Sequence, residues 1–162
     1  MDSPFGNIYV AILGQIQARV PAITHIDQEL GQLKNVRPPV SWPCVLVDFE
    51  DFRFENLGEH VQLASGIVVL RLGFAPYSNS TQATPGAYTE KALWYYGLEW
   101  ALHKALQGWA PAGGTGSLCR TATTTQKRTD NYRVRELRYS LSFEDYSTKR
   151  IITYVPASVV VS

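Results

Sequence analysis

The chain has 162 residues, of which 45% are hydrophobic and 18% charged, and its formal net charge is +1. This length supports one hydrophobic core and is short for two domains, and the composition is that of a globular chain. A net charge near zero excludes a general attraction to nucleic acid or membranes. No stretch reaches the roughly 20 apolar residues of a membrane span, and the first residues lack the basic region of a signal peptide. We expect a soluble, cytoplasmic product.

The charges and the cysteines are unevenly placed. Residues 1–110 contain 7 Lys or Arg and 10 Asp or Glu, whereas residues 111–162 contain 8 and 4. The C-terminal third is therefore basic. Cys44 and Cys119 are too far apart for a metal motif and too few for a disulfide scaffold, which favours a reducing compartment.

The first predicted element is a helix that begins at Ser3-Pro4 and ends at Val20-Pro21. Serine is a good N-cap, proline suits the first helical position, and a residue before proline avoids the helical conformation. Apolar residues recur at three- and four-residue spacing along one face: Phe5, Ile8, Ile12, Ile16 and Val20.

Three strands are predicted next. Residues 23–33 can hold a short one, and residues 35–43 form a proline-rich loop. The second runs from Cys44 to about Phe54, and its apolar phase shifts between Phe49 and Phe52, which indicates a bulge. After turn residues at 56–59, residues 61–74 alternate with apolar side chains on both faces, so both faces of this strand must be covered.

A polar loop over 75–86 precedes a second, long helix that opens at Thr84-Pro85. Its expected core stripe, placed opposite Glu99, His103 and Gln107, is Trp94, Leu98, Ala101, Leu102, Ala105 and Trp109. Proline and glycine end the helix at 110–114.

Two closing strands, 118–128 and 132–143, are joined by a tight connection at 129–132. Alternation over 134–143 gives one apolar and one polar face. The order α-β-β-β-α-β-β predicts an α+β fold, a mostly antiparallel sheet of about five strands flanked by two helices. We expect a single domain over 1–146 and an extended tail over 147–162.

The residues for catalysis are sparse. A nucleophilic site needs Cys or Ser beside a His and a carboxylate, but the three histidines (His25, His60, His103) are scattered. We expect His103 to be solvated and Cys44 to be a buried packing residue. The three histidines and two cysteines have no metal-ligand spacing, and no cofactor is predicted. The chain is not expected to be an enzyme.

Charged and aromatic residues offer candidate interfaces instead. An acidic segment holds Asp48, Glu50, Asp51, Glu55 and Glu59, which fit a solvated strand face and turn. Asp48 and Glu50 lie on the same face of the predicted strand and could in principle flank a metal. The basic hairpin carries Lys127, Arg128, Arg133, Arg135 and Arg138. It fits a solvated hairpin, an interface with an acidic neighbour, or a nucleic-acid site, although acidic residues interrupt the charge. Tyr96 and Trp100 lie away from the core stripe among polar residues, as interface anchors do, unless a second layer buries them.

The element order resembles the tail terminator (tail completion) proteins of tailed bacteriophages over roughly residues 4–145. The local sequences that carry the resemblance are Asp27–Leu33, the proline-rich approach Arg37–Pro43, the strand Cys44–Asp48 and the closing segment Tyr139–Asp145. The final residues, 147–162, have no counterpart.

The resemblance implies a virion protein of the tail or neck, assembled in the host cytoplasm, without enzymatic chemistry. Members form a ring, commonly a hexamer, that caps the tail tube, stops its growth and provides a docking surface for the head connector or stopper. A closed ring needs two different, complementary patches on each subunit, and the acidic 48–59 and basic 127–138 segments are candidates. Alternatives are another neck or head–tail joining ring protein, or a small nucleic-acid-binding module that uses the basic hairpin.

Overall fold

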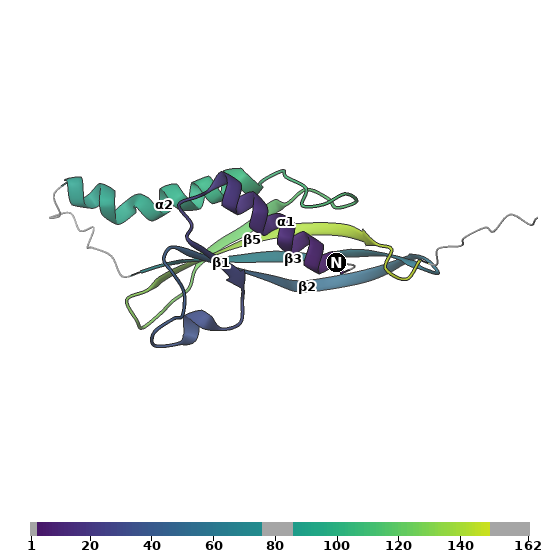
Figure 1. Ribbon diagram of the computed structural model, residues 1–162, viewed down its shortest axis with the longest axis horizontal. Helices are drawn as coiled ribbons and strands as arrows, with labels where there is room; N and C mark the ends of the chain where they lie inside the picture. Colours follow the sequence, from purple (N-terminus) through teal and green to yellow (C-terminus); the bar gives the residue numbers. More distant parts are fainter. Residues whose placement is uncertain (1–2, 76–85, 150–162) are drawn as a thin grey trace, which may run out of the picture.

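The structure is a computed structural model in which residues 3–75 and 86–149 are described. Helices α1 (Pro4–Arg19) and α2 (Gly86–Leu106) lie on one face of a sheet, as Figure 1 shows. The sheet contains, in spatial order, β1 (His25–Gln28), β2 (Cys44–Gly58), β3 (Val61–Phe74), β5 (Arg133–Asp145) and β4 (Cys119–Thr125). Only the β1–β2 pair is parallel; the other three pairs are antiparallel. The predicted α+β fold, with its element order and mostly antiparallel sheet, is confirmed.

Helix α1 forms as its sequence predicts. The Ser3 hydroxyl accepts a hydrogen bond from the Gly6 backbone N–H at 3.3 Å, and Pro4 occupies the first turn. Ile8, Ile12 and Ile16 are fully buried on the side facing the sheet. Burying such side chains contributes about 1.5–3 kcal/mol each, so packing and not intrinsic propensity fixes this helix.

The predicted bulge in β2 is present and has a packing purpose. Asp51 has a φ of 57°, and the register with β3 shifts between Glu50 and Arg53. The extra residue turns Phe52 back to the same side as Phe49, and both rings contact Phe5 of α1, with centroids at 5.0 and 5.1 Å. The bulge therefore fastens the N-terminus of α1 to the sheet.

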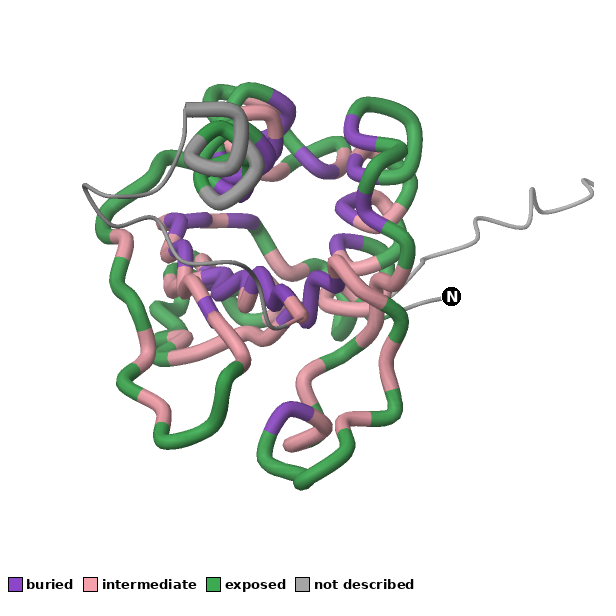
Figure 2. The backbone as a smooth tube through the Cα atoms, turned by 90° about the vertical axis from the view of Figure 1, so that its left-hand side faces the viewer, coloured by how far each residue is buried: buried purple, intermediate pink, exposed green. Residues whose placement is uncertain are grey.

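The main core lies between the helices and the sheet (Figure 2). Alternate residues of β3 and β5 point into it, as the period of two requires. The buried core side chains of these two strands on this side are Ala64, Val68, Leu70, Leu72, Phe74, Leu137, Tyr139, Leu141 and Phe143.

The opposite face of the sheet is covered by the chain between β1 and β2, which contains the 3₁₀ turn η1 (Gln32–Lys34). Leu33, with Val40 and Trp42 beside it, packs on Leu46 and Val134 of the sheet. Both faces of β3 are thus buried toward its C-terminal end, as predicted from its two apolar faces.

Two predicted boundaries are wrong. Strand β2 continues to Gly58, so the turn residues expected at 56–59 mostly belong to the strand ladder. Strand β4 ends at Thr125, and its connection to β5 is a longer loop, because Arg128 Nη2 donates to the Leu33 carbonyl oxygen at 2.5 Å and draws this loop onto the covering segment. The predictions for the loop over 75–86 and for residues 150–162 of the tail fall largely or wholly outside the described residues.

Gly66 of β3 tests the bulge. A Cβ at this position would lie 2.8 Å from the Phe52 Cα, a backbone atom that cannot move aside cheaply. We expect Gly66→Ala to lower the free energy of unfolding by about 1–3 kcal/mol, measured by urea denaturation. Gly14→Ala is the control, because Gly14 is exposed in α1 with nothing within 4 Å of the added Cβ, and it should stabilise by about 0.5–1 kcal/mol. Equal behaviour of the two variants would contradict the packing.

Candidate protein interface

The rotation of helix α2 decides which of its side chains are available. The buried positions are Tyr95, Leu98, Glu99, Leu102, Ala105 and Leu106. The predicted stripe is correct at Leu98, Leu102 and Ala105. Ala101 and Trp109 are partly buried and also pack against the core, Trp109 from beyond the end of the helix. Trp94 is 45% exposed, so it does not belong to the buried stripe. The helix is rolled toward the side that the sequence pattern assigned to solvent.

Two polar side chains on that side account for the roll. Both Glu99 carboxylate oxygens accept hydrogen bonds from Arg135 of β5, at 2.6 and 3.0 Å. His103, expected to be solvated, is half-buried, with Nδ1 3.2 Å from the Tyr139 hydroxyl. Burial, followed by the charge of Arg120, lowers the pKa of His103, so the ring is neutral near pH 7.

Tyr96 and Trp100 remain on the outer side of α2, as predicted. They are 48% and 61% exposed. Leu93, Tyr96, Trp100 and Lys104 follow one another at three- and four-residue spacing, so they form one stripe along the helix. The Lys104 ammonium lies 4.3 Å from the Trp100 ring centroid. Large exposed aromatic side chains beside a cation are typical of protein interfaces.

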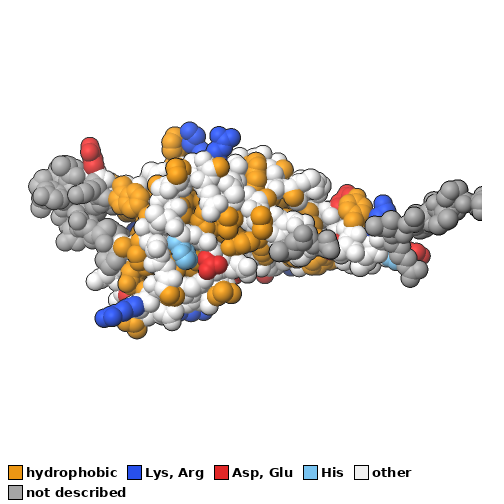
Figure 3. All heavy atoms as spheres, in the orientation of Figure 1, with side chains coloured by type: hydrophobic (Ala, Val, Ile, Leu, Met, Phe, Trp, Pro, Cys, Tyr) orange, Lys and Arg blue, Asp and Glu red, His pale blue; other side chains and the backbone are white. Residues whose placement is uncertain are grey.

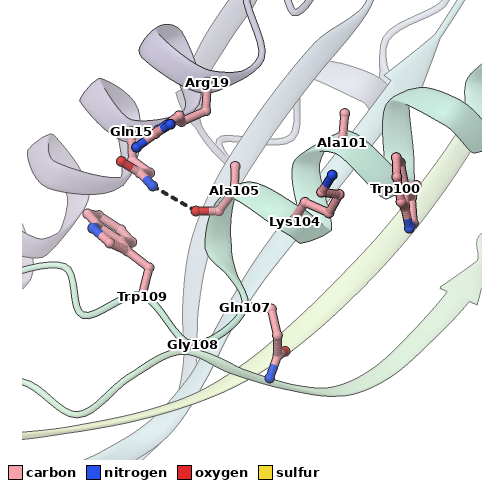
Figure 4. Close-up of a pocket in the computed structure, with 9 residues that line it drawn as sticks. All are labelled: Gln15, Arg19, Trp100, Ala101, Lys104, Ala105, Gln107, Gly108 and Trp109. Atoms are coloured by element: carbon pink, nitrogen blue, oxygen red, sulfur yellow. Dashed lines mark hydrogen bonds between the residues drawn. The ribbon is translucent and has the colours of Figure 1, made fainter.

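The stripe opens onto a groove between α1 and α2, with a volume of about 590 Å³ (Figure 4). Gln15 crosses its floor, where Nε2 donates to the Ala105 carbonyl oxygen at 2.8 Å. Trp100 and Trp109 stand on opposite sides of the groove in Figure 4. The residues that line it are Gln15, Arg19, Trp100, Ala101, Lys104, Ala105, Gln107, Gly108 and Trp109, with no acidic side chain among them.

Most of the predicted basic residues are used inside the subunit. Arg135 pairs with Glu99, and the Arg133 guanidinium lies over the Tyr95 ring at 4.2 Å. Arg128 pairs with Asp130 at 2.5 Å and also donates to the Leu33 carbonyl oxygen, which holds the β4–β5 loop against the segment between β1 and β2. These contacts rigidify β4, β5 and their connection. Of the five basic residues of the predicted hairpin, Lys127 alone is exposed.

The acidic segment likewise contains some residues that form ion pairs within the subunit and others that remain exposed. Arg71 of β3 lies 2.8 Å from Glu50 and 3.4 Å from Asp48, and two further carboxylates, Glu29 and Glu136, are 3.7 and 3.4 Å away. Arg71 is a charged residue inside an otherwise apolar strand, and this irregularity was the signal in the sequence for a partly buried ion network.

Arg138 of β5 extends this network. It lies 2.9 Å from Glu50, 3.0 Å from Glu136 and 3.6 Å from Asp51. The acidic and basic segments that sequence analysis paired between subunits therefore already meet within one subunit. Asp51, 80% exposed at its side chain, and Glu55 keep their carboxylates toward solvent.

The described part of the chain offers few side chains in positions suited to metal binding or nucleophilic catalysis. No group of three or more His, Cys, Asp or Glu side chains there could hold a metal ion. Cys44 is buried, and burial raises the pKa of its thiol to about 12, which leaves no thiolate near neutral pH. No helix in the described residues has the length and apolar character to cross a membrane.

The fold belongs to the class in which two helices cover one face of a mixed five-stranded sheet. No protein-family model matches the sequence, and no curated protein matches it. Among solved structures, the chain is similar to a chain of the virion of a native gene transfer agent (GTA) particle. The likeness covers 84% of this chain and 93% of that chain, with a TM-score of 0.51 and 16% sequence identity. At this identity the likeness shows a shared fold.

Glu50 gives the ion network a measurable pH dependence. Burial acts to raise the pKa of its carboxyl, but hydrogen bonds and positive charge from Arg138 and Arg71 outweigh burial, so the pKa is lowered. A lowered pKa stabilises the folded state above the unfolded-state value of about 4.3, and this stability is lost as pH falls through the folded-state value.

We therefore expect Glu50→Gln to be less stable than the unmodified chain near neutral pH, with the difference shrinking as the solution becomes acidic. Urea denaturation over a pH series measures it. Glu55→Gln is the matched control, because Glu55 is exposed and has no salt bridge among the described residues. A stability difference for Glu50→Gln that is independent of pH would contradict the network.

Proposed function

We propose that this chain is a structural protein of a tailed phage or phage-like particle, and in particular a tail terminator. It forms a ring that caps the tail tube, ends tube elongation and provides the docking surface for the head connector or stopper. It works in the tail or neck of the virion, after assembly in the host cytoplasm, and it carries out no chemical reaction.

The observation that carries this proposal is the shared fold with a chain of a gene transfer agent virion, which extends over most of both chains. The matched chain is part of a virion, and the resemblance of residues 4–145 to tail terminators is a separate line of support. In this proposal the expected single domain, residues 1–146, is the part that builds the ring.

The surfaces described above support assembly. The exposed stripe on α2 and the turn end of the β2–β3 hairpin (residues 54–60), which carries the exposed side chains of Phe54, Glu55, Leu57 and Glu59, occupy different parts of the subunit. Contacts between unlike patches are heterologous, and such contacts close into rings when the rotation between neighbours is a whole fraction of a turn. A hexameric homo-oligomer is the form expected from the family resemblance.

Tube assembly tests the proposal. Purified tail-tube protein from the same particle is polymerised with and without this chain, and tube lengths are measured by electron microscopy. We expect the chain to shorten the tubes and to appear as a ring at one end. Unchanged tube lengths with no bound ring would contradict the terminator role. A ring that binds the isolated head connector but not the tube would identify a head–tail joining protein instead.

A further inference from the structure

The groove between α1 and α2 has an uncompensated positive charge. Arg19 and Lys104 are both exposed at its border. No carboxylate of the described residues forms a salt bridge with either of them, in contrast to Arg71, Arg128, Arg135 and Arg138, each of which does. The walls between the two cations are apolar, mainly Trp100, Ala101 and Trp109. A matching partner must therefore bring both carboxylates and apolar side chains.

The turn end of the β2–β3 hairpin has this complementary chemistry. Glu55 and Glu59 are exposed and lack salt bridges among the described residues. Phe54 and Leu57 are 45% and 56% exposed. The hairpin end (residues 54–60) projects past both helices, as Figure 1 shows, and acidic side chains are visible at that end of the molecule in Figure 3.

The hairpin end is ordered by pairing between its two strands, with a register shift between Asn56 and Gly58. Its strands pair to Gly58 and Val61, and Gln62 Nε2 donates to Asn56 Oδ1 at 2.8 Å across the two strands. An element ordered before binding loses little conformational entropy when it docks. The hairpin end can therefore insert as a preformed wedge.

We propose that the hairpin end of one subunit docks in the α1–α2 groove of a second copy of this chain. Glu55 and Glu59 pair with Arg19 and Lys104, and Leu57 and Phe54 pack against Trp100 and Trp109. This inference rests on the proposed ring function, for which it names the contact between neighbours.

The placement of the two surfaces favours a second copy as the occupant. The groove lies on the helix layer and the hairpin end lies at one extremity of the long axis (Figure 1), so one subunit cannot satisfy its own groove. Each copy offers one wedge and one groove, which produces a head-to-tail chain of contacts that can close. The acidic candidate Glu55 and the aromatic candidate Trp100, distant in one subunit, meet across this contact.

Charge exchange tests the docking. Two variants, Arg19→Glu with Lys104→Glu and Glu55→Lys with Glu59→Lys, each place like charges together, and we expect each to weaken self-association by about 100-fold or more. A mixture of the two variants pairs opposite charges again and should recover association. Native mass spectrometry over a concentration series measures association in solution, and electron microscopy of tail tubes with each variant measures ring formation on the tube. Circular dichroism confirms that each variant is folded.

Lys34→Glu with Arg37→Glu is the matched control, because it makes the same charge change at exposed positions outside the groove and should leave association intact. Docking is overturned if the groove variant still forms rings on tubes, or if the control abolishes them, since the acidic end would then bind elsewhere. Rings that persist in the groove variant leave the terminator role standing. A wild-type chain that forms no ring, in solution or on tubes, overturns both.

Discussion

The structure depends on strand β3 being covered on both of its faces. Its even-numbered residues from Val68 to Phe74 face the helices, and Val69 and Gly73 face the other way and are equally buried. One face is covered by α1 and α2, and the other by the segment that carries Leu33 and Trp42. The covering segments come from both sides of β3 in the sequence: α1 and the segment with Leu33 and Trp42 precede it, and α2 follows it. Cooperative folding of the whole domain follows, because β3 cannot be buried until the chain on both sides of it has docked.

Charge is partitioned between interior and surface. Arg71 and Arg138 form salt bridges with several carboxylates on the face of the sheet away from the helices, and Arg135 forms one with Glu99 on the helix side. Such pairs add modest net stability, since desolvation opposes the attraction, but they fix the relative positions of strands and helix. Arg19 and Lys104 at the groove, and Glu55 and Glu59 at the hairpin end, form none of these pairs and are available to a neighbour.

Much of the fold could be predicted from sequence because short-range rules govern it. The Ser3-Pro4 start of α1, the bulge near Asp51 and the two-faced strand β3 each follow from local pattern. The rotation of α2 about its own axis could not be predicted in this way. A helical wheel places the charged Glu99 on the solvent side, because it contains no information on Arg135, which lies opposite Glu99 only in the folded structure. For the same reason, sequence identified Tyr96 and Trp100 as exposed but did not pair Trp100 with Arg19, which belongs to a different helix.

The bidentate bond between Glu99 and Arg135 has a geometric consequence. A helix can turn about its own axis, and a displacement of one residue in register corresponds to about 100°. Two parallel hydrogen bonds to a guanidinium on a rigid strand stop α2 from turning. The direction in which Trp100 points is thus fixed relative to the sheet. In an assembly whose subunits contact one another through Trp100, this fixed orientation determines the angle between neighbouring subunits. That angle in turn determines how many subunits close a ring.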